Sequence, residues 1–230
     1  MVTCALVVLA ILAAFMVVLS IYPGEFSWVS TRANRWLYDR GAATYEDKWQ
    51  RHDYGAYAAI IADAAMSLEH EGRPLQVLDL ACGTGRATLF AAQYLPPTTR
   101  FTAVDYSRGM LEVFQSSVAH SARLDACDIT WVEADIAVWL DQCEQSFDLV
   151  LFMEAAEFVP GFGRLPAKIH SVCTPGAQLV MTRPAGLWGW MFPGRHQTRR
   201  ALAACLGNAG FVHVRFVPWR SRYELLAARR

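Results

Sequence analysis

The feature that most limits the fold is a series of five short apolar runs between Leu75 and Arg183. Amphipathic segments of helical length separate these runs, near residues 86–95, 108–120, 137–145 and 163–173. Strands that alternate with such helices are typical of βαβ units, in which helices cover both faces of a parallel sheet. The sequence therefore predicts an α/β fold whose first five strands are LQVLDLA, FTAVDY, ITWVEA, FDLVLFM and AQLVMTR.

The end of the chain departs from this alternation. The segments FVHVRFVPW and RYELLAAR lie only a few residues apart, which leaves no room for a crossover helix. We expect them to pair as an antiparallel hairpin. The complete prediction is a Rossmann-like, seven-stranded, mostly parallel sheet with an antiparallel C-terminal hairpin.

Residues 1–24 predict a transmembrane anchor ahead of this sheet. Val2–Tyr22 carries no charge, and at about 1.5 Å rise per residue a helix of this length spans the ~30 Å hydrocarbon core. The absence of a basic first segment argues against a cleaved signal peptide. Arg32, Arg35 and Arg40 follow the apolar stretch, which predicts a single-pass membrane protein with its catalytic domain in the cytoplasm.

The remaining chain divides into two parts. Residues 25–72 predict two helices that form a lid segment, and the second helix carries Tyr54, Tyr57 and Ile61 at spacings of three and four. Residues 73–230 then form the sheet domain.

Composition excludes some classes of function. The 21 basic and 21 acidic residues cancel, so no overall field favours nucleic acid as a partner. The six cysteines are scattered and include no C-x-x-C pair, which argues against a metal site or a disulfide framework.

A glycine turn follows the first predicted strand, in the sequence Val77-Leu78-Asp79-Leu80-Ala81-Cys82-Gly83-Thr84-Gly85-Arg86. Gly83 and Gly85 allow the backbone to turn tightly and to approach a ligand closely. The helix that begins near Arg86 then directs free N–H groups toward an anionic group. A nicotinamide enzyme is the main competitor, but its third glycine would fall on Thr88.

Two further acidic positions end the second and third predicted strands. FTAVDYSRGML places Asp105 about 20 residues past the glycines, where an acidic side chain can accept ribose hydroxyls. WVEADI places Asp135 after the third strand. Asp105 alone does not separate the two classes of cofactor.

Together these three motifs resemble those of class I S-adenosylmethionine-dependent methyltransferases. The resemblance covers residues 38–230 and implies S-adenosylmethionine as the cofactor. It implies that Asp79 orients the loop or meets the ligand's ammonium group, that Asp105 binds the ribose and that Asp135 and Ile136 bind the adenine. The cofactor-binding positions that it implies are Tyr45, Asp79, Ala81, Gly83, Gly85, Asp105, Tyr106, Met110, Asp135, Ile136 and Met153.

Two other stretches are similar to the type 11 and quinone-methylating branches of this family. FDLVLFMEAAEF, residues 147–158, matches their fourth motif, with Phe158 where those proteins often have histidine. YDRGAATY, residues 38–45, matches their entry segment, in which the second tyrosine belongs to a lid over the methyl donor. Simple packing is the alternative for Tyr45.

The acceptor is expected to be a small lipophilic or membrane-resident molecule, such as a lipid, a quinone or an isoprenoid. The aromatic and basic stretch 186–200 favours this class, although it equally fits a loop packed on the sheet edge. His52, Glu154 and His196 are candidate bases by position. Each has an alternative as a surface or supporting residue, so we name no catalytic residue.

Two other functions remain open at this point. A membrane-anchored scaffold could keep the cofactor fold without turnover, and this would be favoured if the segment between Tyr38 and Tyr54 blocked the pocket. An NAD-dependent oxidoreductase is disfavoured by Thr88 and by the C-terminal hairpin.

Overall fold

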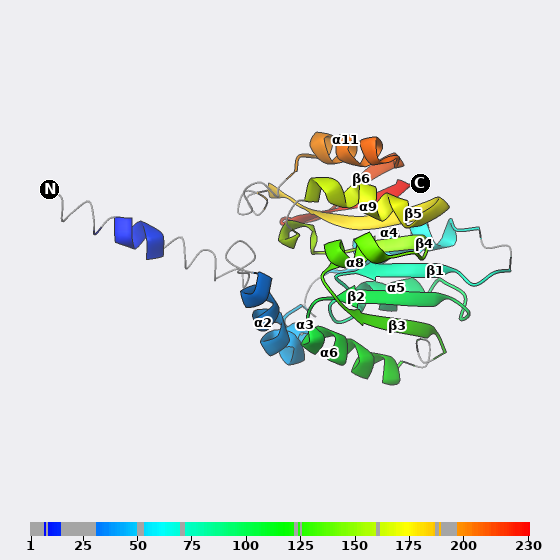
Figure 1. Ribbon diagram of the computed structural model, residues 1–230, viewed down its shortest axis with the longest axis horizontal. Helices are drawn as coiled ribbons and strands as arrows, with labels where there is room; N and C mark the ends of the chain where they lie inside the picture. Colours follow the sequence, from blue (N-terminus) through cyan, green and yellow to red (C-terminus); the bar gives the residue numbers. More distant parts are fainter. Residues whose placement is uncertain are drawn as a thin grey trace.

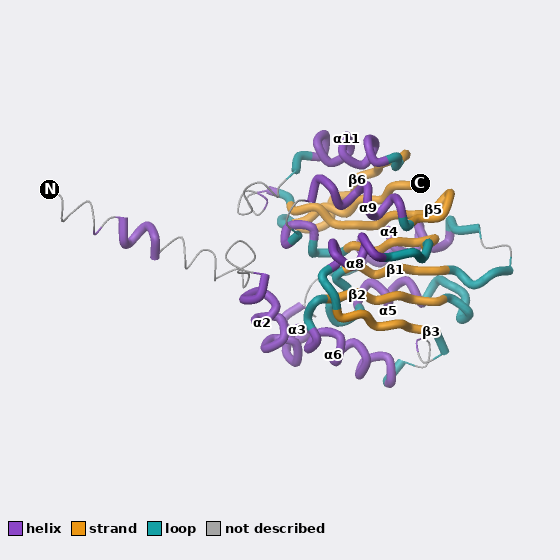
Figure 2. Tube along the Cα trace, viewed as in Figure 1, coloured by secondary structure: helices purple, strands orange, loops and turns teal. Residues whose placement is uncertain are grey.

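The computed structural model describes residues 7, 9–14, 31–49, 53–69, 72–121, 124, 126–159, 162–186, 189 and 197–230. In this part of the chain a seven-stranded sheet has the order β3-β2-β1-β4-β5-β7-β6, with helices on both of its faces (Figure 1, Figure 2). The predicted α/β fold is confirmed.

Five strands pair in parallel, and the last strand of the chain is the only one of the seven that runs in the opposite direction. The parallel strands are β1 (Gln76–Leu80), β2 (Arg100–Asp105), β3 (Asp128–Glu133), β4 (Phe147–Phe152) and β5 (Cys173–Pro184). The last two strands, β6 (Val212–Arg220) and β7 (Tyr223–Arg229), form the predicted hairpin, and β7 pairs with β5 on its other side. The chain therefore inserts its final strand between β5 and β6.

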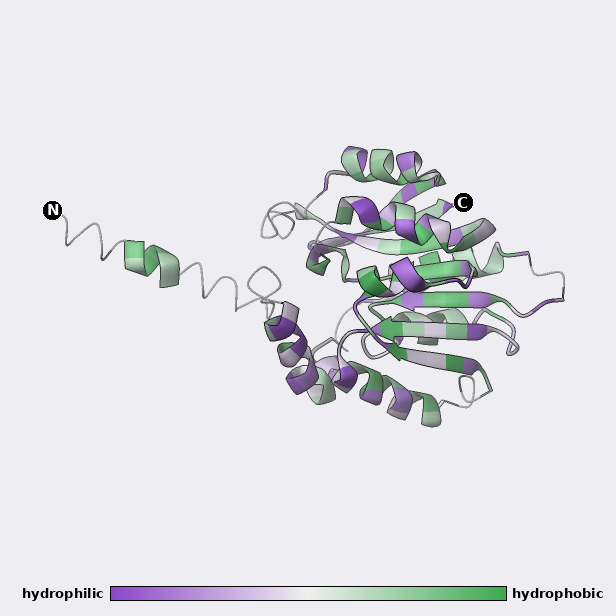
Figure 3. Cartoon of the chain, viewed as in Figure 1, coloured by the Kyte–Doolittle hydropathy of each residue, from purple (hydrophilic) through white to green (hydrophobic). Residues whose placement is uncertain are grey.

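The helices form one layer on each face of the sheet. One layer holds α4 (Gly55–Met66), α5 (Arg86–Ala92) and α6 (Arg108–Ala119), and the other holds α8 (Ile136–Gln142), α9 (Leu165–Ser171) and α11 (Arg199–Ala209). Successive side chains of β1 point to opposite faces of the sheet. Val77 packs in the core beneath α4, α5 and α6, and Leu78 packs in the core beneath α8, α9 and α11. The central strands are apolar along most of their length because both faces are covered (Figure 3).

The segment before β1 contains more elements than the two helices predicted. It forms α2 (Thr31–Gly41), the 3₁₀ turn η1 (Ala42–Thr44), the short α3 (Tyr45–Trp49) and then α4. Tyr57 and Ile61 of α4 are buried in the core beside α5, so α4 belongs to the sheet domain. Within the predicted lid segment, α2 and η1 contact α6.

The predicted transmembrane helix finds no support in the structure. Among the described residues, no helix is both long and apolar enough to cross a membrane. Most of Val2–Tyr22 lies outside the described residues, apart from residues 7 and 9–14. Those residues are helical, and the Leu9 and Ile11 side chains are each 62% exposed.

Candidate active site

A cavity opens where the strand order reverses, between β1 and β4. Ligands of open α/β sheets bind at this position, outside the carboxyl ends of the strands. Residues that follow β1, β2, β3 and β4 line the cavity, and side chains of α2 and α3 cover it. It holds about 1040 Å³ of space, part of which is open to solvent.

The turn after β1 forms the floor of the cavity and uses left-handed backbone at three positions. Ala81, Gly83 and Gly85 have φ values of 52°, 54° and 82°. A Cβ atom on Gly83 would meet nothing within 4 Å, so the cavity side of this turn is open. This is the close approach to a ligand that the sequence predicted for Gly83.

Asp105 holds this turn in place. Its carboxylate accepts hydrogen bonds from the backbone N–H of Gly83 and from that of Ser107, each at 2.8 Å. The side chain is buried, and burial raises the pKa of Asp105 to about 6. The predicted ribose-binding carboxylate therefore also fixes the glycine turn.

Asp79 lies beneath the same turn. It accepts hydrogen bonds from the backbone N–H of Thr88 at 3.2 Å and from its hydroxyl at 2.7 Å. Burial raises the pKa of Asp79 to about 7. Thr88, which stands where a nicotinamide enzyme would have its third glycine, thus anchors α5 to β1. Two buried carboxyl groups beside one cavity favour a cationic ligand, because a positive charge stabilises their ionised forms.

Asp135 begins α8 as its N-cap residue. Its Oδ1 accepts hydrogen bonds from the backbone N–H groups of Ala137 at 2.9 Å and Val138 at 3.4 Å. Asp135 and Ile136 both line the cavity. The predicted adenine-binding position is therefore a helix terminus that faces the site.

The predicted lid segment reaches the cavity through α2 and α3. Asn34 is only 2% exposed, and its Nδ2 donates a hydrogen bond to the hydroxyl of Tyr106 at 2.7 Å. Asp39 accepts hydrogen bonds from the Ser107 hydroxyl at 2.6 Å and from the Gly109 backbone N–H at 3.0 Å. These contacts join the lid to the segment that follows β2, and the lid lines the cavity without filling it.

The structure brings the predicted cofactor-binding residues together, with one exception. All of them line the cavity except Gly85, and the ones that do are Tyr45, Asp79, Ala81, Gly83, Asp105, Tyr106, Met110, Asp135, Ile136 and Met153. A Cβ atom on Gly85 would lie 2.2 Å from the ring of Phe114 in α6. The glycine at this position is thus required for helix packing rather than for access to the cavity.

Sequence reasoning missed Asn34 and Arg86 as cavity residues. Asn34 lies in a polar helix that no ligand motif marks, and its Oδ1 has no hydrogen-bond partner among the described residues. The sequence marks Arg86 only as the start of a helix. Its partners come from elements far away in the sequence, which no local pattern reveals.

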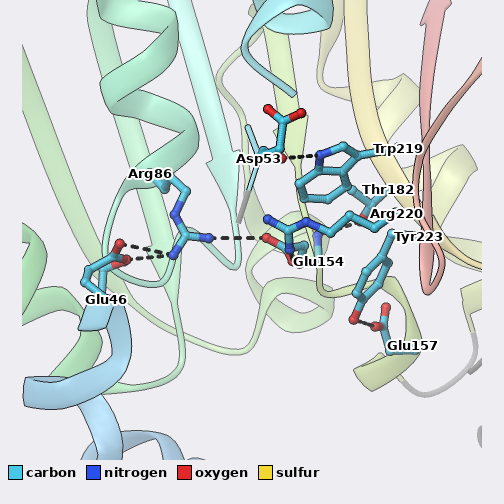
Figure 4. A network of polar contacts seen from close by, with 10 residues as sticks. Glu46, Asp53, Arg86, Glu154, Glu157, Thr182, Trp219, Arg220 and Tyr223 are labelled. Atoms are coloured by element: carbon cyan, nitrogen blue, oxygen red, sulfur yellow. Dashed lines mark hydrogen bonds and ion pairs between the residues drawn. The ribbon is translucent and has the colours of Figure 1, made fainter. Parts of the chain in front are cut away.

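Glu154 holds two arginines at the wall of the cavity (Figure 4). Its carboxylate pairs with Arg86 at 3.3 Å and with Arg220 at 3.2 Å, and its side chain is 15% exposed. Both carboxylate oxygens of Glu154 are therefore occupied by ion pairs. The other candidate bases, His52 and His196, lie outside the described residues, as does most of 187–196.

Comparison with known families identifies the sheet domain. The family described as "Methyltransferase domain" matches residues 77–176, which span β1 to the start of β5 and include the three acidic positions. Residues 77–176 therefore match a methyltransferase domain. The nicotinamide alternative is not supported.

Relatives of this methyltransferase domain act on different molecules. The chain is 30% identical over 158 residues to a trans-aconitate 2-methyltransferase of Paracidovorax citrulli. The matched region covers 66% of the chain and 55% of this relative. The chain is also 28% identical over 135 residues to a demethylmenaquinone methyltransferase of Lactiplantibacillus plantarum. This second match covers 55% of the chain and 56% of the relative. The chain thus spans a little more than half the length of these relatives.

A solved structure shows the same fold. The N-methyltransferase NodS of Bradyrhizobium japonicum, crystallised with S-adenosyl-L-homocysteine, superimposes with a TM-score of 0.63 at 17% identity. The superposition covers 86% of this chain and 98% of NodS. At this identity the likeness concerns the fold alone.

Proposed function

We propose that this chain transfers a methyl group from S-adenosylmethionine to a small acceptor with an apolar body. One observation carries the proposal. Asp79, Asp105 and Asp135 lie far apart in the sequence, and the methyltransferase domain brings them to one cavity beside the open turn at Gly83.

The cavity suits S-adenosylmethionine in charge and in hydrogen-bonding groups. The buried carboxyl groups of Asp79 and Asp105 favour a ligand that carries a positive charge. Gly83 leaves room for a ligand against the backbone, and Asn34 offers a buried acceptor oxygen without a partner among the described residues. Asp105 and Asp135 are the residues we propose for the ribose and the adenine.

When bound, the cofactor supplies a methyl group on a positively charged sulfur. The chain's own residues contribute position and shelter. Asp105 and the turn at Gly83 fix one end of the cavity, while Tyr38 and Tyr45 of the lid cover it and limit access of water. Displacement from a sulfonium needs no obligatory acid or base, and this agrees with a Glu154 that is already paired with two arginines.

An apolar acceptor is supported by the cavity wall near β4. Met153, Ala155, Phe158 and Val159 line this side beside Glu154, and the centroid of the Tyr38 ring lies 6.5 Å from that of the Phe158 ring. Phe158 stands where related branches often have histidine, which makes the wall less polar. Relatives named as demethylmenaquinone methyltransferases are consistent with a lipophilic acceptor.

A transfer assay tests this proposal. The full chain is incubated with methyl-labelled S-adenosylmethionine and with either a lipid extract or a water-soluble extract of bacterial cells. We expect label in a lipid product, and loss of that label with Asp105→Ala. Label only in a water-soluble product would contradict the lipophilic acceptor, and label in neither extract would contradict transferase activity on such molecules.

We also propose that residues 2–22 anchor the chain in a membrane, with the methyltransferase domain on the cytoplasmic side. The uncharged length of this segment and the arginines that follow it support the proposal. The measurement is fractionation of cells that express the full chain, followed by a carbonate wash. Retention in the membrane pellet is expected, and recovery in the supernatant would contradict the anchor.

A further inference from the structure

The guanidinium of Arg86 lies between two carboxylates at the edge of the cavity (Figure 4). Its Nη1 donates to Glu154 at 3.3 Å. Its Nη2 donates to both carboxylate oxygens of Glu46, at 3.0 and 3.1 Å. The Arg86 side chain is 14% exposed and lines the cavity, so both ion pairs form in a partly dehydrated place.

The two carboxylates are held differently. Glu154 follows a central strand, its backbone N–H donates to Thr182 at 2.5 Å, and its side chain is 15% exposed. Glu46 lies in α3, a helix of five residues in the lid, and its side chain is 39% exposed. Besides Arg86 it accepts a hydrogen bond from the Thr84 hydroxyl. Glu154 is thus fixed by the sheet, whereas Glu46 can be replaced if the lid shifts.

The charges on this wall balance only while Glu46 is in place. Arg86 and Arg220 share the single carboxylate of Glu154, and the Glu46 carboxylate supplies the second negative charge. An arginine remains charged at every physiological pH. If Glu46 leaves, one positive charge faces the cavity in surroundings that strengthen its attraction for an anion.

We propose that Glu46 occupies a carboxylate-binding subsite, and that a ligand's carboxylate replaces it on Arg86. This inference rests on the proposed function and adds a chemical class to the ligands of the same cavity. Nη2 of Arg86 contacts both carboxylate oxygens of Glu46, whereas Nη1 contacts Glu154. Arg86 can therefore bind an incoming carboxylate in place of Glu46 and still keep its ion pair with Glu154. The incoming group belongs either to the amino-acid part of the methyl donor or to the acceptor.

Substitution of Glu46 tests the subsite directly. Glu46→Gln removes the competing charge and keeps the size of the side chain. Asp47→Asn is the matched control, because it removes one charge from the same short helix at an exposed position. The full chain and both variants are titrated calorimetrically with S-adenosylhomocysteine, with 5′-methylthioadenosine, and with octanoate and citrate in the presence and absence of S-adenosylhomocysteine.

The two sources of the carboxylate give different results. If the donor supplies it, Glu46→Gln binds S-adenosylhomocysteine three- to tenfold more tightly and leaves 5′-methylthioadenosine, which lacks the amino-acid part, unchanged. If the acceptor supplies it, the affinity for octanoate or citrate rises by the same factor and that for S-adenosylhomocysteine does not. In both cases Arg86→Lys, which keeps the charge and loses the planar fork, abolishes the gain when combined with Glu46→Gln.

The inference is overturned if Glu46→Gln leaves the affinities for S-adenosylhomocysteine, octanoate and citrate within twofold of the unmodified chain. It is also overturned if Asp47→Asn produces the same gain, because the effect would then be one of general charge. Failure of the proposed function has a separate signature, since the unmodified chain would then bind neither S-adenosylhomocysteine nor 5′-methylthioadenosine.

Discussion

The two sides of the cavity are built in different ways. On the floor, Asp79 and Asp105 bind backbone N–H groups of residues that lie 2 to 22 positions away in the sequence. On the facing wall, Arg86 and Arg220 pair with carboxylates that lie 40 to 68 positions away. The floor is therefore fixed by strand ends and tight turns, whereas the wall depends on the fold that assembles it and on the position of the lid.

The largest effect is expected from removal of a floor carboxylate. Asp105→Ala takes away the acceptor of two backbone hydrogen bonds and the group proposed to bind the ribose. We expect the affinity for S-adenosylhomocysteine to fall by more than about 100-fold, roughly 2.7 kcal/mol. Calorimetric titration measures it, with Asp128→Ala at an exposed strand position as the control. Affinity within threefold of the unmodified chain would contradict this role.

Gly85→Ala tests whether the floor also depends on close packing. The new methyl group would lie 2.2 Å from the Phe114 ring, at a φ of 82° that side chains rarely adopt. The free energy of unfolding is expected to fall by about 3 kcal/mol. Gly207→Ala in α11, where nothing lies within 4 Å, is the control and is expected to change it by less than about 1 kcal/mol. Equal denaturation midpoints for the two variants would rule out the packing role.

Glu154→Gln examines the facing wall. The change removes the charge that Arg86 and Arg220 share, at a position only 15% exposed. We expect the free energy of unfolding to fall by about 2 kcal/mol. Glu112→Gln, which removes an exposed partner of Arg108, is expected to cost less than about 0.5 kcal/mol. Urea denaturation of both variants gives the comparison, and an equal cost would mean that the wall contributes no more than a surface pair.

The smallest effect concerns pH and belongs to the floor. The pKa of Asp79 is about 7 and that of Asp105 about 6, both above the usual 3.8, so the folded chain keeps protons that the unfolded chain releases. Their contribution to stability is fully present below about pH 4 and is lost as the pH rises through 6 to 7.

Binding of cationic S-adenosylmethionine favours the ionised carboxylates. We therefore expect the increase in melting temperature caused by this ligand to be larger at pH 8 than at pH 5.5. Thermal denaturation with and without ligand at several pH values measures this. Asp79→Asn should make this increase in melting temperature less dependent on pH. An increase of the same size at pH 5.5 and pH 8 in the unmodified chain would contradict the link between ligand binding and the two carboxyl groups.

The sequence predicted the floor well because each of its elements has a local pattern. Gly83 follows an apolar strand, Asp105 ends the second strand and Asp135 follows the third, so the topology of a parallel sheet is enough to bring them to one edge. The C-terminal hairpin was predictable for a similar reason, since the short connection excludes a crossover helix.

The wall and the lid could not be predicted in the same way. The sequence makes Glu154 a candidate base, but its two arginines come from α5 and β6, and only the folded chain shows that they meet there. Gly85 matched a ligand motif, yet its neighbour is the Phe114 ring in α6, a contact that no spacing reveals. Asn34 lies in a helix whose sequence carries no recognisable ligand pattern.

The most direct test of the central claim is calorimetric titration of the full chain with S-adenosylhomocysteine, with NADH as the control ligand. We predict saturable binding of S-adenosylhomocysteine at one site per chain and no binding of NADH. Binding of NADH alone, or of neither ligand, would contradict a methyl-donor site in this cavity.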